Sequence, residues 1–92
     1  MAPLRLHKYQ WLKGETNSWL RVPLNHIKTL CLEKVISPWS RRLGTDVLLE
    51  RNIDAKRFVE AWEHFNKEPV RFSGEADVSQ TDIRKLKPYH NQ

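Results

Sequence analysis

The chain has 92 residues, of which 39% are hydrophobic and 29% charged, and its formal net charge is +5. This length predicts a single domain over residues 1–92, and the composition is that of a globular chain and excludes a disordered one. A single cysteine excludes an intrachain disulfide framework of the kind that staples small secreted domains.

The N-terminal segment predicts a β-hairpin. Residues 4–12 alternate between two mixed sets of side chains, which indicates a half-exposed or edge strand. Residues 13–18 have the composition of a turn. Residues 19–22 form a second short strand, which Pro23 ends because proline cannot donate to the sheet.

A short amphipathic helix is predicted after the hairpin, from Pro23 to about Leu32. Proline suits the first helical position, and apolar residues then recur on one side of the helix. Cys31 lies in this apolar run, so we expect it to be a small buried side chain and not a nucleophile.

A second hairpin is predicted between residues 35–41 and 46–51. The segment from Asp46 to Glu50 is the clearest apolar strand of the chain and is expected to be the more central one. Pro38 restricts the preceding strand to a sheet edge or a bulge.

The strongest predicted element is a helix from about Ala55 to Asn66. Its apolar residues fall at i, i+3, i+4, i+7 and i+10 and form one stripe: Ala55, Phe58, Val59, Trp62 and Phe65. Asp54 precedes the stripe and is predicted to be its N-cap, a role that contributes about 1 kcal/mol.

The C-terminal part contains a short strand at residues 70–72 and an ambiguous segment at 81–89. A helix there is favoured by the apolar spacing of Ile83 and Leu86. It is also favoured by a capping pattern at its start, formed by Ser79 and Asp82. A basic edge strand pairing with residues 70–76 is favoured by the polar turn between the two short runs. We choose the strand.

The predicted fold is therefore an α+β domain. It has a small antiparallel sheet of about five to six short strands in the order ββα-ββα-ββ, with one strong amphipathic helix and one short helix.

No catalytic constellation is complete in the sequence. Glu60, Glu63 and His64 share a side of the strong helix, but a helical zinc-protease site needs two histidines and a third ligand. A solvated helix face explains these residues better, so we expect no metal. The glycines are isolated in predicted turns and form neither a phosphate loop nor a dinucleotide pattern. We expect no cofactor and no enzyme activity.

Charge and aromatic residues point instead to binding. Residues 1–45 carry eight Lys/Arg and two Asp/Glu, whereas residues 46–92 carry eight and nine. Basic side chains attract phosphates, exposed aromatic rings stack on bases, and both residue types also dominate protein interfaces. They gather in three clusters. The first is Arg5, His7, Lys8, Tyr9, Trp11 and Lys13, the second is Trp39, Arg41 and Arg42, and the third is Arg84, Lys85, Lys87, Tyr89 and His90. The candidate binding surface comprises Lys8, Tyr9, Trp11, Lys13, Trp39, Arg41, Arg42, Arg84, Lys85, Lys87 and Tyr89.

The function expected from the sequence is a small non-enzymatic binding module, an adaptor or inhibitor-type domain with a protein partner or a second copy of itself. The alternative is a basic nucleic-acid-binding protein of low sequence specificity. No apolar run has the length of a membrane span and no leader-like apolar region opens the chain, so we expect a cytoplasmic protein without a membrane partner. A merging of the basic clusters on one surface would favour nucleic acid, and scattered clusters beside an apolar patch would favour protein.

Overall fold

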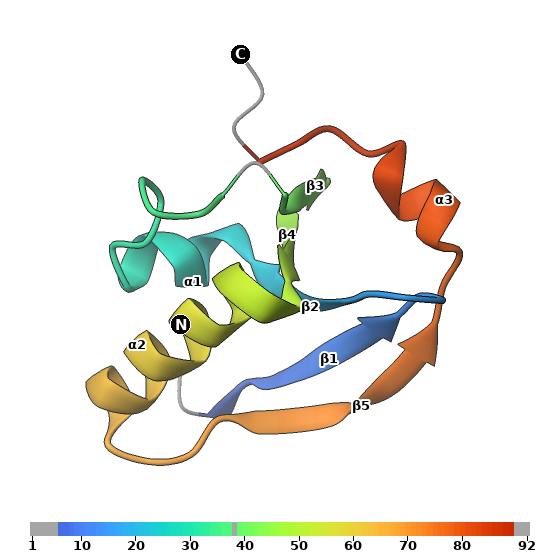
Figure 1. Ribbon diagram of the computed structural model, residues 1–92. Coiled ribbons are helices and arrows are strands. Elements are labelled where there is room, and N and C mark those ends of the chain that lie inside the picture. Colours follow the sequence, from blue (N-terminus) through green and yellow to red (C-terminus); the bar gives the residue numbers. More distant parts are fainter. Residues whose placement is uncertain (1–5, 38, 90–92) are drawn as a thin grey trace.

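A single sheet organises the computed structural model, which describes residues 6–37 and 39–89. Its strands are β1 (Lys8–Lys13), β2 (Ser18–Pro23), β3 (Arg41–Leu43), β4 (Asp46–Glu50) and β5 (Arg71–Asp77). The helices are α1 (Leu24–Thr29), α2 (Lys56–Asn66) and α3 (Gln80–Arg84), and a π-helical turn (Arg51–Ala55) runs directly into α2. The strand order β3-β4-β2-β1-β5 places β5 and β3 at the two sides (Figure 1). The predicted α+β class is confirmed.

The first hairpin pairs as predicted, the second pairs residues 41–43 and not 35–41 with β4, and the last strand also differs from the prediction. β1 pairs antiparallel with β2, with Trp11 opposite Leu20, and β3 pairs antiparallel with β4. β5 pairs with β1 in parallel, with a register shift between Tyr9 and Gln10. The sheet is therefore mixed and not wholly antiparallel, because the chain returns through α2 before β5 joins the sheet.

Alternation along the strands divides the apolar residues between the two faces of the sheet. On one face, under α1 and α2, a large cluster includes Tyr9, Leu20, Phe58 and Trp62. On the other face, a smaller cluster forms under α3: Leu12, Trp19, Leu48 and Ile83. Figure 1 shows α1 and α2 together on one side and α3 on the other.

The predicted stripe on α2 is confirmed except at its end. Ala55, Phe58 and Trp62 are buried, and Val59 packs against the same cluster. Phe65 is 58% exposed. It lies in the last turn of α2 at the margin of the stripe, where the helix extends past the core.

The start of this helix differs from the prediction. Helical structure begins at Arg51, and the Glu50 side chain caps it by accepting a hydrogen bond from the Asn52 amide at 3.1 Å. Asp54 lies inside the helical turn and is not the N-cap, because its carboxyl group points to the loop before β3.

The C-terminal segment is a helix followed by an edge bridge, and the strand chosen from the sequence was wrong. α3 begins at the cap Ser79, whose side chain accepts from the Asp82 amide at 3.4 Å. The chain then passes along β3, where Pro88 bridges Arg41 in the antiparallel sense. The segment therefore borders β3 and not β5.

Three smaller predictions also change. The first strand of the second hairpin is short and begins at Arg41. Cys31 is exposed with a φ of 57°, because the chain turns there after α1. Pro23 is the cap of α1 and not its first residue. The roles predicted for Leu4, Arg5, Pro38 and His90 lie outside the described residues. Among the helices that the structure describes, none has the length and apolar character required to cross a membrane.

Candidate functional site

An exposed tryptophan lies in a hollow between the second and third basic clusters of the sequence. Trp39 is 64% exposed. Together with Arg41 and Arg84 it lines a hollow of about 350 Å³, the Trp39 hollow. Trp19, Glu50, Ile53, Asn17 and Asn52 complete the wall. The exposed indole and two arginine side chains therefore border one hollow that is open to a ligand.

A second hollow adjoins the same part of the chain. Arg42, Lys85, Lys87 and Tyr89 line this Tyr89 hollow, which measures about 540 Å³. The Arg42 guanidinium carbon lies 6.0 Å from the centre of the Tyr89 ring, within the range of a cation–π contact. Burial raises the pKa of the Tyr89 hydroxyl, Glu33 adds to this, and Arg42 opposes it.

Backbone pairing beside β3 explains why these residues meet. The Arg42 amide donates to the Lys87 carbonyl at 2.8 Å, and the Tyr89 amide donates to the Ser40 carbonyl at 2.8 Å. The Arg41 guanidinium donates to the Leu86 carbonyl at 3.4 Å. Residues 45 positions apart in sequence thereby become neighbours.

We call the resulting group of five cations the cationic surface: Arg41, Arg42, Arg84, Lys85 and Lys87. None of them forms an ion pair within residues 6–37 and 39–89. The Arg42 Nε atom is buried without a hydrogen-bond partner, so packing and not a carboxylate holds this side chain. The charge of the surface is therefore available to an external anion.

Two buried polar groups position this site, and no sequence pattern predicted the contacts of either one. The Gln80 Oε1 atom accepts from the amides of Thr16 and Asn17 at 2.9 and 3.1 Å, which fixes the start of α3 to the β1–β2 turn. The Asp54 carboxyl group accepts from the Ser37 amide at 2.9 Å and from the Ser37 hydroxyl at 2.6 Å.

Asp54 also connects to both ends of the short loop that carries Trp39. The buried Ser40 hydroxyl donates to Asp54 and accepts from the Glu50 amide at 3.0 Å. The Ser37 hydroxyl oxygen accepts from the Trp39 amide at 3.2 Å. The position of the exposed indole therefore depends on a fully buried carboxyl group.

The first basic cluster does not join the cationic surface directly. Tyr9 is fully buried, so its predicted role in stacking was wrong. It faces the helices because its hydroxyl has polar partners inside the core: it accepts from Trp62 Nε1 at 3.1 Å and lies 2.8 Å from His26 Nδ1. Lys8 is exposed on β1, which two strands separate from β3.

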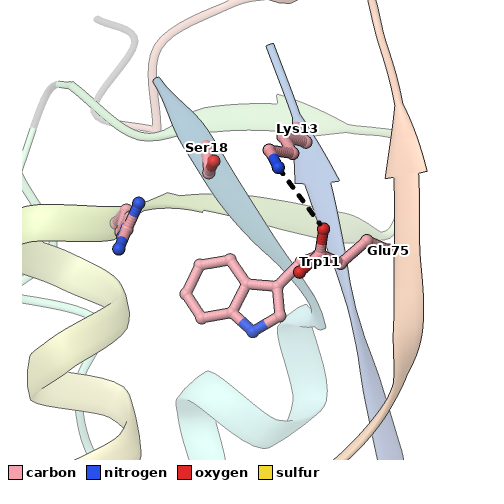
Figure 2. A pocket seen from close by; sticks show the side chains of 5 residues that line it. Trp11, Lys13, Ser18 and Glu75 are labelled. Atoms are coloured by element: carbon pink, nitrogen blue, oxygen red, sulfur yellow. Dashed lines mark ion pairs between the residues drawn. The ribbon is translucent and has the colours of Figure 1, made fainter. Parts of the chain in front are cut away.

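Trp11 and Lys13 lie on the face of β1 that α1 and α2 cover. With Ser18, Arg51 and Glu75 they line a further hollow, the Trp11 hollow (Figure 2). The Trp11 ring lies 5.8 Å from that of Phe72 on β5. The exposed Lys13 and Glu75 side chains form a long ion pair at 3.9 Å. A carboxylate therefore lines this hollow, as Glu50 lines the Trp39 hollow.

The buried tyrosine forms part of an acid-sensitive chain. Since the Tyr9 hydroxyl accepts from Trp62, its own proton is free to donate to His26 Nδ1. The pKa of His26 is lowered to about 4, mainly because the ring is buried. The nearby His7 ring adds to this shift, and Asp46 opposes it. Burial also lowers the pKa of His7, whose ring centre lies 4.7 Å from that of His26.

Stability should therefore fall in acid. A folded-state pKa of about 4, below the ordinary 6.5, means that the contribution of His26 is complete above pH 6.5 and is lost as the pH falls towards 4. We expect a loss of about 1–2 kcal/mol, since His26 is only partly buried and solvent screens its charge. Urea unfolding at several pH values measures it. His26→Asn should flatten the curve, and His64→Asn on exposed α2 is the control; equal curves for wild type and His26→Asn would contradict the assignment.

Within the described part of the chain, no group of three or more His, Cys, Asp or Glu side chains could hold a metal ion. Glu63 instead accepts a hydrogen bond from the Val70 amide at 3.1 Å, and His64 is exposed. Neither a protein-family model nor a curated protein nor a solved structure matches the chain. The site is therefore defined by its own geometry.

Proposed function

We propose that this protein binds nucleic acid through the cationic surface, without catalysis and with low sequence specificity, in a cytoplasmic setting. The observation that supports the proposal is the meeting of the second and third basic clusters around two accessible aromatic rings. Arg41 and Arg84 line the Trp39 hollow, and Lys85 and Lys87 line the Tyr89 hollow.

Phosphate chemistry favours this arrangement. Each Lys or Arg that meets a phosphate releases condensed counterions, which supplies most of the affinity of non-specific complexes. Cations that already have a carboxylate partner would lose it on binding, and these five have none among the described residues. Aromatic rings beside them add stacking that depends little on base identity.

Charge removal within the cationic surface should therefore reduce both affinity and its salt dependence. The triple variant Arg84→Gln, Lys85→Gln, Lys87→Gln changes only exposed side chains. With about 0.7 counterions released per phosphate contact, the slope of log affinity against log salt should fall by about 2 for single strands. Fluorescence anisotropy with labelled oligonucleotides over a range of salt concentrations measures this slope.

A triple variant elsewhere on the molecule is the matched control. Lys28→Gln, Lys34→Gln and Lys67→Gln remove the same charge from exposed positions that line neither hollow. Equal losses in the two triple variants would mean that net charge and not this surface attracts the ligand. No binding at tens of micromolar protein and low salt would remove the function, since non-specific binders reach about 10⁻⁴ to 10⁻⁶ M.

A protein partner or homodimer is the second candidate, and the observation that favours it is the edge strand β5. Its residues are exposed except for the half-buried Ala76, and Phe72 is 44% exposed. A partner strand could pair with such an edge. However, the register shift beside Gly74, whose φ is 128°, distorts β5, and bulges protect edges from pairing. This candidate becomes the leading one if no oligonucleotide binds.

A further inference from the structure

Three hollows at one end of the sheet share lining residues. The Trp11 hollow measures about 360 Å³ and shares Lys13, Ser18 and Arg51 with a smaller hollow of about 190 Å³ at the β1–β2 turn. That turn hollow shares Asn17 and Asn52 with the Trp39 hollow. A path of adjoining depressions therefore leads from Trp11 to Trp39.

This path passes around the end of the sheet from one face to the other. Trp11 lies on the face under α2, whereas the Trp39 hollow includes Trp19, which packs on the opposite face under α3. Lys13 and Ser18 pair at the end of the hairpin, and Trp19 pairs with Glu50 one step further along β2. The two indoles are thus joined by the polar end of the strands and not by the core.

Arg51 lies at the middle of the path, where Lys13 and Glu15 also line the turn hollow. It is the first residue of the π-helical turn, it is exposed, and it lines both the Trp11 hollow and the turn hollow. It has no ion pair to any acidic side chain that the structure describes. In the sequence, Arg51 is an isolated cation far from the basic clusters, so no pattern predicted it as a binding residue.

We infer that a single nucleic-acid strand follows this path, with one base at Trp39, another in the Trp11 hollow, and a phosphate at Arg51 between them. The inference rests on the proposed function and specifies its ligand. A duplex hides its base faces and is stiff over about 150 base pairs, so it cannot turn around the end of a sheet. A single strand bends freely and offers every base for stacking.

Removal of the Glu75 carboxylate should raise the affinity for single strands, whereas removal of a cation should lower it. Glu75 lines the Trp11 hollow and forms an ion pair with the Lys13 ammonium group (Figure 2). The carboxylate therefore repels a phosphate in this hollow and also competes with the phosphate for Lys13. Glu75→Gln should therefore tighten binding of long single strands. Glu68→Gln removes the same charge at a residue that does not line the Trp11 hollow or the turn hollow and should change the affinity less.

The decisive experiment measures affinity against oligonucleotide length. Homopyrimidine DNA and RNA strands of about 4 to 16 nucleotides cover the range of single-strand site sizes. Arg51→Gln should lower the salt slope by about 0.7 for the longest strands and leave the shortest unchanged, because only long strands reach from Trp39 past Arg51. Lys28→Gln on α1 is the charge-matched control.

Trp39→Ala should weaken single-strand binding by roughly 5- to 100-fold and duplex binding far less. Phe65→Ala removes another exposed aromatic ring and should have no such effect. Duplexes that bind as tightly as single strands, or Arg51→Gln and Lys28→Gln variants that behave alike at every length, would overturn the path and leave the cationic surface in place. Absence of binding by every oligonucleotide would overturn both proposals.

Discussion

Trp62→Ala should lower the free energy of unfolding by about 3–5 kcal/mol, which is a large part of the stability of a domain of this size. Trp62 is fully buried in the cluster under α2, so truncation leaves a cavity that its neighbours fill only in part. It also removes the indole N–H that donates to the Tyr9 hydroxyl at 3.1 Å. Urea unfolding followed by far-UV circular dichroism measures the change, because the signal does not depend on the tryptophan removed.

Two variants separate packing from the hydrogen bond. Trp62→Phe keeps most of the volume and loses the donor, so a loss of about 1–2 kcal/mol is expected. Phe65→Ala, on the exposed side of the same helix, should change stability by no more than about 0.5 kcal/mol. If Phe65→Ala destabilised the protein as much as Trp62→Ala, Phe65 would belong to the core, as the apolar stripe predicts, and its observed exposure would be contradicted.

The local elements were predictable because each has a sequence pattern of its own. The apolar spacing that places Phe58 and Trp62 on one side is typical of a helix, and the short continuous apolar run of β4 is typical of a strand buried on both faces. Turn residues between β1 and β2 then fixed the hairpin. Only the ends of these elements were misplaced, since they depend on caps such as Glu50 that no period reveals.

Pairings between distant segments were not predictable from such patterns. β5 joins β1 in parallel because α2 carries the chain back along the sheet, and nothing in residues 71–77 specifies that neighbour. Likewise, the bridge between Arg41 and Pro88 depends on where α3 docks. The capping pattern at Ser79 did indicate the helix correctly. The choice between helix and strand depended on whether a neighbouring strand was available for pairing, which the sequence does not reveal.

The candidate site shows the same division. Its residue types could be predicted, since Lys and Arg beside aromatic residues are visible in the sequence. Their arrangement could not, because Tyr9 lies in the core whereas Trp39 lies in the open, and both belong to clusters of similar composition. Arg51 joined the path only through the fold.

Asp54 has the most consequential role that the sequence misassigned, because it joins stability to the site. Its carboxyl oxygens accept hydrogen bonds from the Ser37 amide, the Ser37 hydroxyl and the Ser40 hydroxyl in a fully buried position. These groups fix the loop that carries Trp39, since the Ser37 hydroxyl oxygen also accepts from the Trp39 amide. A change at Asp54 should therefore affect both folding and the exposed indole.

Asp54→Ala should cost about 3–5 kcal/mol, well above the roughly 1 kcal/mol of a lost helix cap, because it leaves buried donors without an acceptor. Asp54→Asn keeps one acceptor oxygen but turns an amide group towards the serine donors, so its loss should be intermediate. Asp77→Ala, at an exposed position at the end of β5, is the matched control and should remain within about 0.5 kcal/mol. Urea unfolding gives the three values. A loss near 1 kcal/mol for Asp54→Ala would restore the cap interpretation. The larger loss, together with weaker binding of single strands by the folded Asp54→Asn variant, would establish that this carboxyl group holds Trp39 in place.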